Sequence, residues 1–200
     1  MKRFLNPADD ELKVLPLRVC DGSPYPLSRA NIDKLISLSH IEEYSNGELI
    51  MKAGEIFTCL AIVISGITRV WHNEGNREKT LYFGLEGTVC MSMHGYMYDF
   101  PATENREACG PVRMLVINRD ELNRFMAANA EVYKWFLGRL MIQLYCFENK
   151  NKILRGSAEE QYRAIVEHRP DIANKVPLKH IASYIGITPI HLSRIRGRKK

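Results

Sequence analysis

The side chains best suited to chemistry in this chain lie near the end of the sequence. Arg194 and Arg196 carry guanidinium groups, which bind phosphate oxygens or the edge of a guanine base. From residue 172 onward there are seven Lys and Arg and no Asp or Glu, whereas the preceding residues carry 21 basic and 23 acidic side chains. A basic end on a near-neutral body is typical of a protein that binds a phosphate backbone, although basic tails are also common as solvated ends.

Two short helices joined by a tight turn would have to position these side chains. Gly186 suits the turn because it tolerates positive φ, and Ala182 suits a close helix crossing because it is small. Thr188 can cap the second helix, and Pro189 fits its first position. The apolar residues recur at helical spacing and would form the inner faces: Ile181, Ile185, Ile187, Leu192 and Ile195. This pattern predicts a helix-turn-helix, and an ordinary helical hairpin is the alternative.

A helix-turn-helix places its second helix in the major groove of DNA, so the outward side chains of residues 188–196 are candidate DNA contacts. We expect Arg194 to contact a base or a phosphate. Pro189 and Ile190 can touch thymine methyl groups but cannot form bidentate hydrogen bonds with bases. The predicted DNA-contacting residues are Lys179, Thr188, Pro189, Ile190, His191, Ser193, Arg194, Arg196, Arg198 and Lys199.

A long helix is predicted from about residue 130 to residue 154, a stretch with no Pro and one Gly. Its apolar residues follow alternating steps of four and three, which is the heptad spacing of a helix that packs against a parallel partner. Asn151 would lie at a core position, where it would set the register with its copy. The predicted dimer seam is Leu137, Leu140, Leu144, Phe147, Asn151 and Leu154. The alternative is a single helix lying on its own domain.

Short apolar or alternating runs separated by glycines occupy residues 44–117, which is typical of an antiparallel sandwich or barrel of jelly-roll type. Residues 73–76 are predicted to form a hairpin turn. Ser28 is expected to cap a short helix that ends near Ser39. A further helix is expected from Ser157, with Glu160 completing a capping box, to His168, where Pro170 would end it.

These elements predict an α+β fold. The expected divisions are an irregular segment at 1–27, a β-roll (jelly-roll, double-stranded β-helix) sensor domain at 28–128, a dimerisation helix at 129–155 and a helix-turn-helix domain at 156–200.

The composition excludes several other classes of protein. Hydrophobic residues make up 46% of the chain, yet no apolar run approaches the ~20 residues of a membrane span, and no secretory signal is visible. The five cysteines are scattered without a CxxC pair, so we expect reduced thiols, a cytoplasmic protein and no metal site. Cys90 and His94 alone are too few ligands for a metal. No nucleophile elbow, P-loop or clustered His and Glu is present, so an enzyme is not expected.

The order of elements and several local motifs resemble the Crp/Fnr family of bacterial transcription regulators, over roughly residues 28–197, and details of residues 176–196 are similar to members from Bacteroidetes. The resemblance is carried by the predicted helix-turn-helix and by Gly47-Glu48, Lys52–Glu55, Ile64–Gly66, Gly87 and Ile117–Leu122. It implies a cyclic-nucleotide-binding-type sensor domain and a homodimer that binds double-stranded DNA. RNA polymerase is a further partner that it suggests. It also implies that Arg194 matches an Arg that the family uses at the groove, whereas Pro189 and Ile190 replace an Arg and a Glu that read bases in relatives.

In members that respond to cyclic nucleotides, the resemblance implies a Gly-Glu pair for the ribose and an Arg followed by Ser or Thr for the cyclic phosphate. The matching positions here are Met91-Ser92 and Ala102-Thr103, and only Thr103 is retained. A buried phosphate needs a compensating cation, and Arg106 lies nearby, but strand alternation leaves open the side of the strand on which it lies. We therefore predict that the usual cAMP binding is lost. The roll would either bind a different, more apolar effector or bind none, and no cofactor is assigned.

The chain is thus predicted to be a homodimeric, sequence-specific regulator of transcription. A ligand-sensing module whose helical end contacts another protein is the alternative. Relatives carry a β-hairpin wing after the second helix, whereas only three residues follow Gly197, so we expect no wing and weaker DNA binding.

Overall fold

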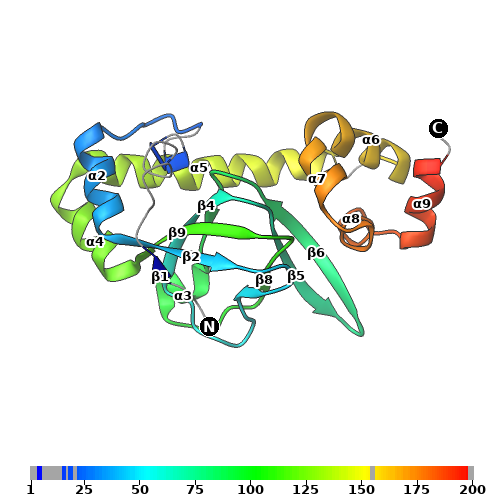
Figure 1. The fold of residues 1–200 in the computed structure, drawn as a ribbon, viewed down its shortest axis with the longest axis horizontal. Helices are drawn as coiled ribbons and strands as arrows, with labels where there is room; N and C mark the ends of the chain where they lie inside the picture. The colour runs from blue at the N-terminus through cyan, green and yellow to red at the C-terminus, as the bar shows by residue number, and fades with distance from the viewer. Residues whose placement is uncertain (1–3, 6–14, 17, 20–21, 154–155, 198–200) are drawn as a thin grey trace.

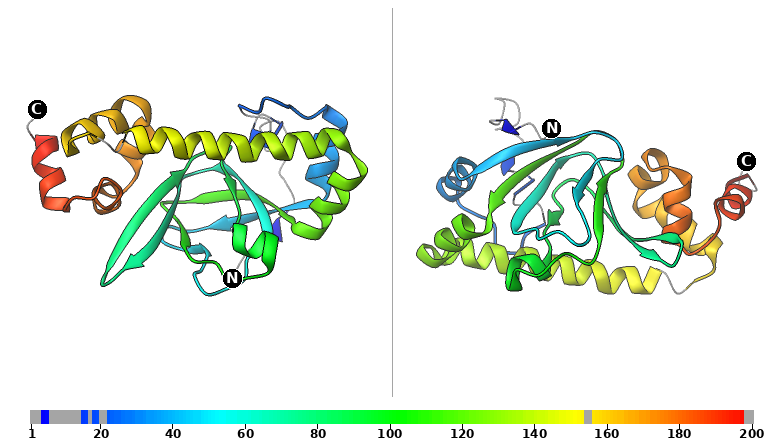
Figure 2. Two further views of the ribbon diagram at one scale, coloured as in Figure 1. Left: turned by 180° about the vertical axis from the view of Figure 1, so that it is seen from behind. Right: turned by 90° about the horizontal axis from the view of Figure 1, so that it is seen from below.

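The computed structural model describes residues 4–5, 15–16, 18–19, 22–153 and 156–197, and shows a β-roll, one long helix and a C-terminal helical unit (Figure 1). The long helix α5 (Ala130–Ile153) runs along one side of the roll. Helices α2 (Arg29–Ser37) and α4 (Arg119–Ala128) lie at one end of α5, and the C-terminal unit lies at the other (Figure 2). The two ends of α5 are therefore occupied by different parts of the chain.

The roll consists of two antiparallel sheets, as the sequence predicts. One sheet has the order β1-β2-β9-β4-β7 and the other β3-β8-β5-β6. The strands are β1 (Phe4–Leu5), β2 (Ser39–Tyr44), β3 (Leu49–Met51), β4 (Cys59–Ser65), β5 (Thr68–Glu74), β6 (Arg77–Gly84), β7 (Val89–Cys90), β8 (Asn105–Ala108) and β9 (Val112–Asn118). The predicted hairpin is confirmed, since Glu74 pairs with Arg77 and Gly75 takes a φ of +61° in the turn. The predicted α+β fold with a jelly-roll domain is therefore confirmed.

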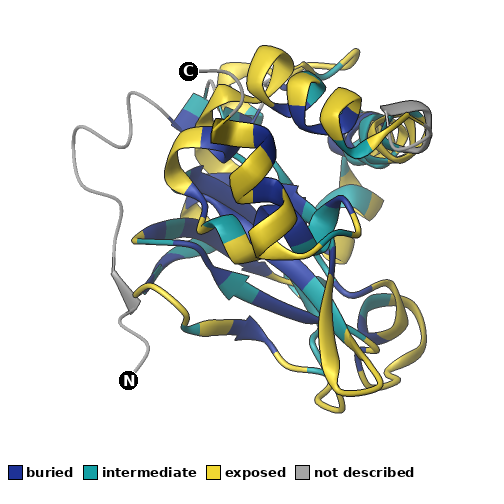
Figure 3. Cartoon of the chain, turned by 90° about the vertical axis from the view of Figure 1, so that its right-hand side faces the viewer, coloured by how far each residue is buried: buried dark blue, intermediate teal, exposed yellow. Residues whose placement is uncertain are grey.

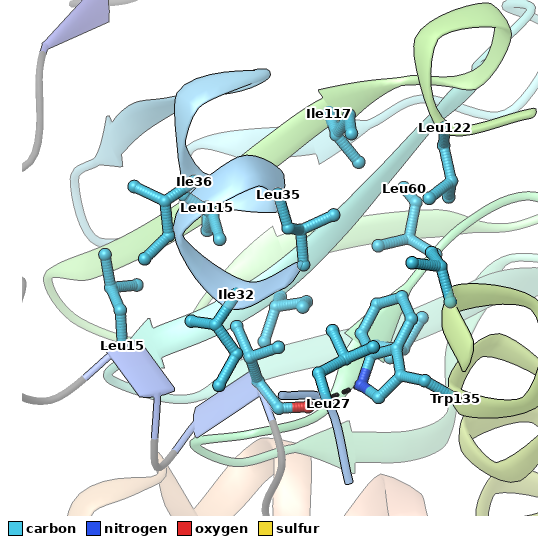
Figure 4. Close-up of a cluster of buried hydrophobic side chains, with 14 of the residues drawn as sticks. Leu15, Leu27, Ile32, Leu35, Ile36, Leu60, Leu115, Ile117, Leu122 and Trp135 are labelled. Carbon is cyan, nitrogen blue, oxygen red and sulfur yellow. Dashed lines mark hydrogen bonds between the residues drawn. The ribbon is translucent and has the colours of Figure 1, made fainter. Parts of the chain in front are cut away.

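A buried cluster joins the first sheet to α2, α4 and the start of α5 (Figure 4). Trp135 is its largest fully buried side chain, and its indole Nε1 donates to the backbone oxygen of Val19 at 2.8 Å. Leu15 is also fully buried here, so described residues before position 27 take part in the core. Removing a buried tryptophan of this kind costs about 3–5 kcal/mol, so this contact fixes α5 on the roll.

The C-terminal unit contains four helices: α6 (Ala158–His168), α7 (Pro170–Lys175), α8 (Leu178–Tyr184) and α9 (Pro189–Gly197). The predicted capping box of α6 is confirmed, because the Ser157 hydroxyl accepts from the Glu160 backbone and the Glu160 carboxylate accepts from the Ser157 backbone. Ile67, Phe83 and Cys109 of the roll share one buried cluster with this unit. The C-terminal unit is therefore packed against the roll of its own chain.

Several local predictions are wrong in detail. Residues 1–27 are not wholly irregular, because Phe4–Leu5 forms β1 against β2. Ser28 lies before α2 but makes no side-chain cap, and its backbone N–H donates to the Glu131 carboxylate instead. Pro170 ends α6 and also begins α7, since proline is well suited to the first turn of a helix. A short helix that was not predicted, α3 (Met93–Tyr98), follows β7.

Within the described part of the chain, no helix is long and apolar enough to cross a membrane. The expected absence of a wing concerns residues beyond Gly197, which lie outside the described residues.

Candidate nucleic-acid interface and effector region

Helices α8 and α9 form the predicted helix-turn-helix. Gly186 takes a φ of +76° in the turn between them, a conformation that L side chains rarely adopt. The Thr188 hydroxyl accepts from the backbone N–H of His191 at 3.2 Å and so caps α9. The predicted inner residues are buried, except for Ile187, which is half-buried: Ile181, Ala182, Ile185, Leu192 and Ile195. The inner face of the motif is thus fixed by packing.

The outer face of α9 is exposed and basic. Arg194 and Arg196 are both solvent-exposed, and Asp171 is the last carboxylate in the sequence. Ile190 is 68% exposed, which is unusual for an isoleucine on a packed helix. The other exposed members of the predicted DNA-contacting set are Lys179, Thr188, Pro189, His191 and Ser193. Arg198 and Lys199 lie outside the described residues. Figure 3 shows exposed and buried positions alternating along the helices at this end of the molecule.

Helix α8 is fastened to strand β6 by its own side chains. The Ser183 hydroxyl donates to the backbone oxygen of Glu78 at 2.7 Å and accepts from the backbone N–H of Thr80 at 2.9 Å. The Phe83 and Tyr184 rings pack with their centroids 5.4 Å apart. These contacts position the helix-turn-helix relative to the roll, whereas α9 lies farther from the sheets (Figures 1 and 2).

His180 is a second contact between α8 and the roll. It is buried, and its Nε2 lies 3.8 Å from Oε1 of Glu107 on β8. The same Glu107 oxygen accepts a hydrogen bond from the buried Arg69 at 2.8 Å. Burial, followed by repulsion from Arg69 and Lys179, lowers the pKa of His180 to about 4, although Glu78 acts in the opposite direction. The imidazole is therefore neutral near pH 7.

The predicted dimer helix has one face on the roll and one apolar face in solvent. Leu137 is 44% exposed and Leu144 is 62% exposed. Met141 and Tyr145, which do not belong to the predicted heptad seam, are also exposed on this helix. This exposed apolar stripe is a candidate interaction surface.

The other predicted seam residues differ in their surroundings. Leu140 is half-buried. Phe147 is partly exposed but also contacts the roll, because its ring lies edge-to-face with Tyr82 at 5.3 Å. The side chain of Asn151 and all of Leu154 lie outside the described part of the structure.

The four predicted cassette residues do not form a common pocket lining. Ser92 is buried, and its hydroxyl accepts from the Gly95 backbone N–H at 3.1 Å as the cap of α3. Ala102 is buried and pairs through its backbone with Gly54 and Glu55. Met91 packs against the main core, whereas Thr103 is exposed. A cavity of about 500 Å³ elsewhere in the chain is lined by none of these four residues.

Arg106 is buried inside the roll, where its guanidinium contacts the side chains of Tyr82, Cys90 and Thr68. Its Nη2 donates to the Tyr82 hydroxyl at 2.7 Å, and its Nη1 contacts the sulfur of Cys90 at 2.6 Å and the hydroxyl of Thr68 at 3.3 Å. Its Nε has no hydrogen-bond partner among the described residues. The hydrogen-bonding contacts of the Arg106 guanidinium are therefore made inside the roll. Among the described residues, no group of three or more His, Cys, Asp or Glu side chains could hold a metal ion.

Comparisons with known proteins agree with this architecture. Residues 41–129 match the cyclic nucleotide-binding domain family. The fold is similar to that of FixK2 from Bradyrhizobium japonicum, with 18% identity, a TM-score of 0.69 and coverage of 80% of this chain and 83% of FixK2. The c-di-GMP responsive global regulator CLP of Xanthomonas campestris has 16% identity, a TM-score of 0.66 and coverage of 86% and 91%. No curated protein matches the chain in sequence.

A protein from Eubacterium rectale that is described as a Crp/Fnr family transcriptional regulator has 16% identity, a TM-score of 0.65 and coverage of 86% of this chain and 83% of its own. Residues 41–129 are thus similar to the cyclic nucleotide-binding domain family, and the chain as a whole has a fold like that of Crp/Fnr-type proteins, as its sequence motifs predict. CLP is described as a global regulator that links cell-cell signaling to virulence gene expression.

Proposed function

We propose that the chain is a homodimeric, sequence-specific DNA-binding regulator of transcription. The observation that carries this proposal is the division of α9 into two faces. Leu192 and Ile195 are buried, whereas Arg194 and Arg196 are exposed on a helix without acidic residues. A short helix held by a packed inner face, with a basic outer face, is suited to the major groove. The functional division is a sensor unit at 28–128, a dimer helix at 129–155 and a DNA-binding unit at 156–200.

Within the groove, Arg194 would contact a base edge or a phosphate, and the other polar members of the predicted set would contact phosphates. Pro189 and Ile190 are exposed at the beginning of α9 and can pack against thymine methyl groups. The DNA sequence read by this protein should therefore differ from the one read by relatives that carry Arg and Glu at these positions.

A second copy of the chain would cover the exposed stripe of α5. Leu137, Met141 and Leu144 lie on one face of the helix and are solvent-exposed in the single chain. Burying apolar surface contributes about 25 cal/mol per Å², so pairing two such stripes favours a dimer. A parallel arrangement would present two copies of α9 to half-sites about 34 Å apart on the DNA.

We propose that the sensor roll does not bind cAMP in the usual cassette. Ala102 replaces the phosphate-binding arginine, and Arg106 is committed to Tyr82, Cys90 and Thr68 inside the roll. A calorimetric titration of the full chain with cAMP should give no saturable heat. Saturable binding at physiological nucleotide concentration would contradict this part of the proposal.

The proposed function is tested by selecting genomic DNA fragments with the purified full chain. The affinity for an enriched fragment is then measured by fluorescence anisotropy at several salt concentrations. A DNA-binding regulator should enrich a common sequence with two half-sites, and the logarithm of its affinity should fall linearly with the logarithm of the salt concentration. Failure to enrich any sequence, together with affinity that does not depend on salt, would contradict the proposal.

A second candidate function is binding of another protein through the helical end. The observation that favours it is that Ile190, which is 68% exposed, lies next to the exposed Pro189, so two neighbouring residues present apolar surface at the start of α9. Replacing Ile190 by Ser distinguishes the two functions. A DNA-binding protein should show altered sequence preference, whereas a protein-binding module should have no DNA affinity to alter.

A further inference from the structure

The described residues line a cavity of about 500 Å³ that is partly open to solvent and lies where the three parts of the chain meet. The roll supplies β6 and the segment that joins it to β7, α5 supplies residues 139–150, and the C-terminal unit supplies α6, α7 and α8. The convergence of β6, the end of α5 and α6–α8 is visible in Figure 1. This volume lies within the range of about 300–1,000 Å³ that is usual for small-molecule sites.

Most of the cavity wall is apolar. Leu85 of the roll, Ile142 of α5, and Ile165 and Ile172 of the C-terminal unit all line it. Four aromatic rings form two pairs that cross the boundaries between the parts. Phe83 packs on Tyr184 at 5.4 Å between the roll and α8, and Tyr82 packs on Phe147 at 5.3 Å between the roll and α5. A ligand with an apolar or aromatic body would therefore touch all three parts of the chain at once.

Cations are in excess among the polar residues that line the cavity. Lys150, Arg169 and Arg139 all line it, whereas the one lining carboxylate, Glu86, is already paired with Arg18. Arg139 is buried and donates to the backbone oxygen of Gly87. This excess of positive charge against an apolar wall calls for an anionic group on whatever occupies the cavity.

Lys150 is the cation best placed to receive that anion. Its ammonium group donates to the backbone oxygen of Leu81 and lies 5.3 Å from the centre of the Tyr184 ring. Within the described residues it has no carboxylate partner, and burial together with nearby Lys79 lowers its pKa. An ammonium group has three donors, so it can bind an anion while it keeps the contact with Leu81.

We propose that this cavity binds a small amphipathic carboxylate, with the carboxylate at Lys150 and the apolar body between the aromatic pairs. This site is separate from the cassette positions, since none of Met91, Ser92, Ala102 or Thr103 lines it. On the proposed function as a DNA-binding regulator, the ligand also couples the roll to the helix-turn-helix, because both form its walls. The ligand then changes the affinity for DNA, and DNA changes the affinity for the ligand by the same factor.

Ligand binding is tested by calorimetric titration of the full chain without DNA, using decanoate, decanol and decylammonium as matched probes. Their concentrations are kept below the micelle concentrations of the two ionic probes and below the solubility of decanol. Decanoate should bind, and decanol should bind at least about tenfold more weakly because it lacks the charge. Decylammonium should not bind. Equal affinity for decanol and decanoate, or no saturable heat from decanoate, would overturn the proposal. Decyl phosphate binding about tenfold more tightly than decanoate would overturn the assignment of a carboxylate.

Two variants locate the site. Lys150→Met keeps most of the apolar stem, so it should reduce the affinity for decanoate about tenfold and leave the affinity for decanol unchanged. The control is Lys134→Met, at an exposed position of α5, which should change neither affinity. Ala164→Phe places a ring in the cavity wall and should abolish binding of both probes while circular dichroism remains unchanged. Unreduced decanoate affinity in either Lys150→Met or Ala164→Phe would show that the probe binds elsewhere and would overturn the proposal.

Coupling is tested separately, by titrating the selected DNA in the presence and absence of decanoate. A change in DNA affinity supports the regulatory role. If decanoate binds at Lys150 but leaves DNA affinity unchanged, the site stands and the coupling fails. If no DNA is bound at all, the proposed function fails while the ligand site is still decided by the calorimetry.

Discussion

The Ser183 hydroxyl of α8 bridges two backbone groups of β6, donating to the oxygen of Glu78 and accepting from the N–H of Thr80. These residues are more than 100 positions apart in the sequence, so the bridge is a tertiary contact between the helix-turn-helix and the roll. It is accompanied by the ring contact of Phe83 with Tyr184. The orientation of the motif is therefore determined by the roll as well as by the end of α5.

Replacing Ser183 by Ala should destabilise the folded chain by about 1–2 kcal/mol, because the variant leaves the Thr80 N–H without its acceptor. Urea unfolding of the full chain measures this change as a lower midpoint. Ser193→Ala, at an exposed position on α9, is the matched control and should have an effect within about 0.5 kcal/mol. Equal midpoints for the two variants would show that the bridge contributes nothing to stability.

The stability of the chain should fall as the pH is lowered, because His180 is buried in its neutral form. Its pKa is about 4 in the folded chain and 6.5 as a model value, so the unfolded state takes up the proton first. The contribution of His180 to the free energy of unfolding is complete above the pKa of this residue in the unfolded state. It is lost as the pH falls toward the pKa of this residue in the folded chain. Arg69 and Lys179 oppose the charged form, and Glu78 favours it. Between about pH 7 and pH 5 the free energy of unfolding is expected to fall by about 2 kcal/mol.

Urea unfolding at several pH values measures this dependence. His180→Gln should flatten the profile in this range, since glutamine does not titrate. His191→Gln, at an exposed position of α9, is the control and should retain the slope. A profile of His180→Gln that is as steep as that of the unchanged chain would contradict the assignment to His180.

The elements that could be predicted from the sequence are those specified by local patterns. The helix-turn-helix was predictable because its isoleucines, Gly186 and Pro189 each satisfy a requirement within a few residues of one another. The β-roll was predictable from glycine-punctuated short strands. Helix α3 was not, because a six-residue helix that contains Gly95 is too short to show helical periodicity.

The surfaces and cavities depended on contacts that the sequence does not specify. The heptad pattern identified Leu137 and Leu144, but it could not show which side of α5 the roll covers, so it missed Met141 and Tyr145. Strand alternation left the direction of Arg106 open, and only the folded roll shows its guanidinium at Tyr82. The cavity at Lys150 joins three segments far apart in the sequence. No short stretch of the sequence therefore shows a pattern that would predict this site.

Replacing Leu144 by Glu should weaken dimerisation, because it places a charge in the apolar stripe of α5. Analytical ultracentrifugation should show a shift from dimer toward monomer, with DNA affinity reduced in parallel. The matched control is Ile56→Glu, since Ile56 is 56% exposed on the roll and Leu144 is 62% exposed on α5. An unchanged dimer in Leu144→Glu, or the same dissociation in both variants, would show that this stripe is not the dimer contact.

Replacing Arg194 by Ala should reduce affinity for the selected DNA by about 1–3 kcal/mol and relax the base preference at one position in each half-site. The reason is that Arg194 is exposed in the middle of α9, where a guanidinium can reach a base edge or a phosphate. Anisotropy titrations with the selected site and a scrambled site separate the two roles. A loss of affinity for the selected site alone indicates a base contact, whereas an equal loss of affinity for both sites indicates a phosphate contact.

Arg124→Ala, at an exposed position of α4 far from α9, is the matched control and should bind both sites normally (Figure 1). Wild-type affinity in Arg194→Ala would remove this residue from the proposed interface.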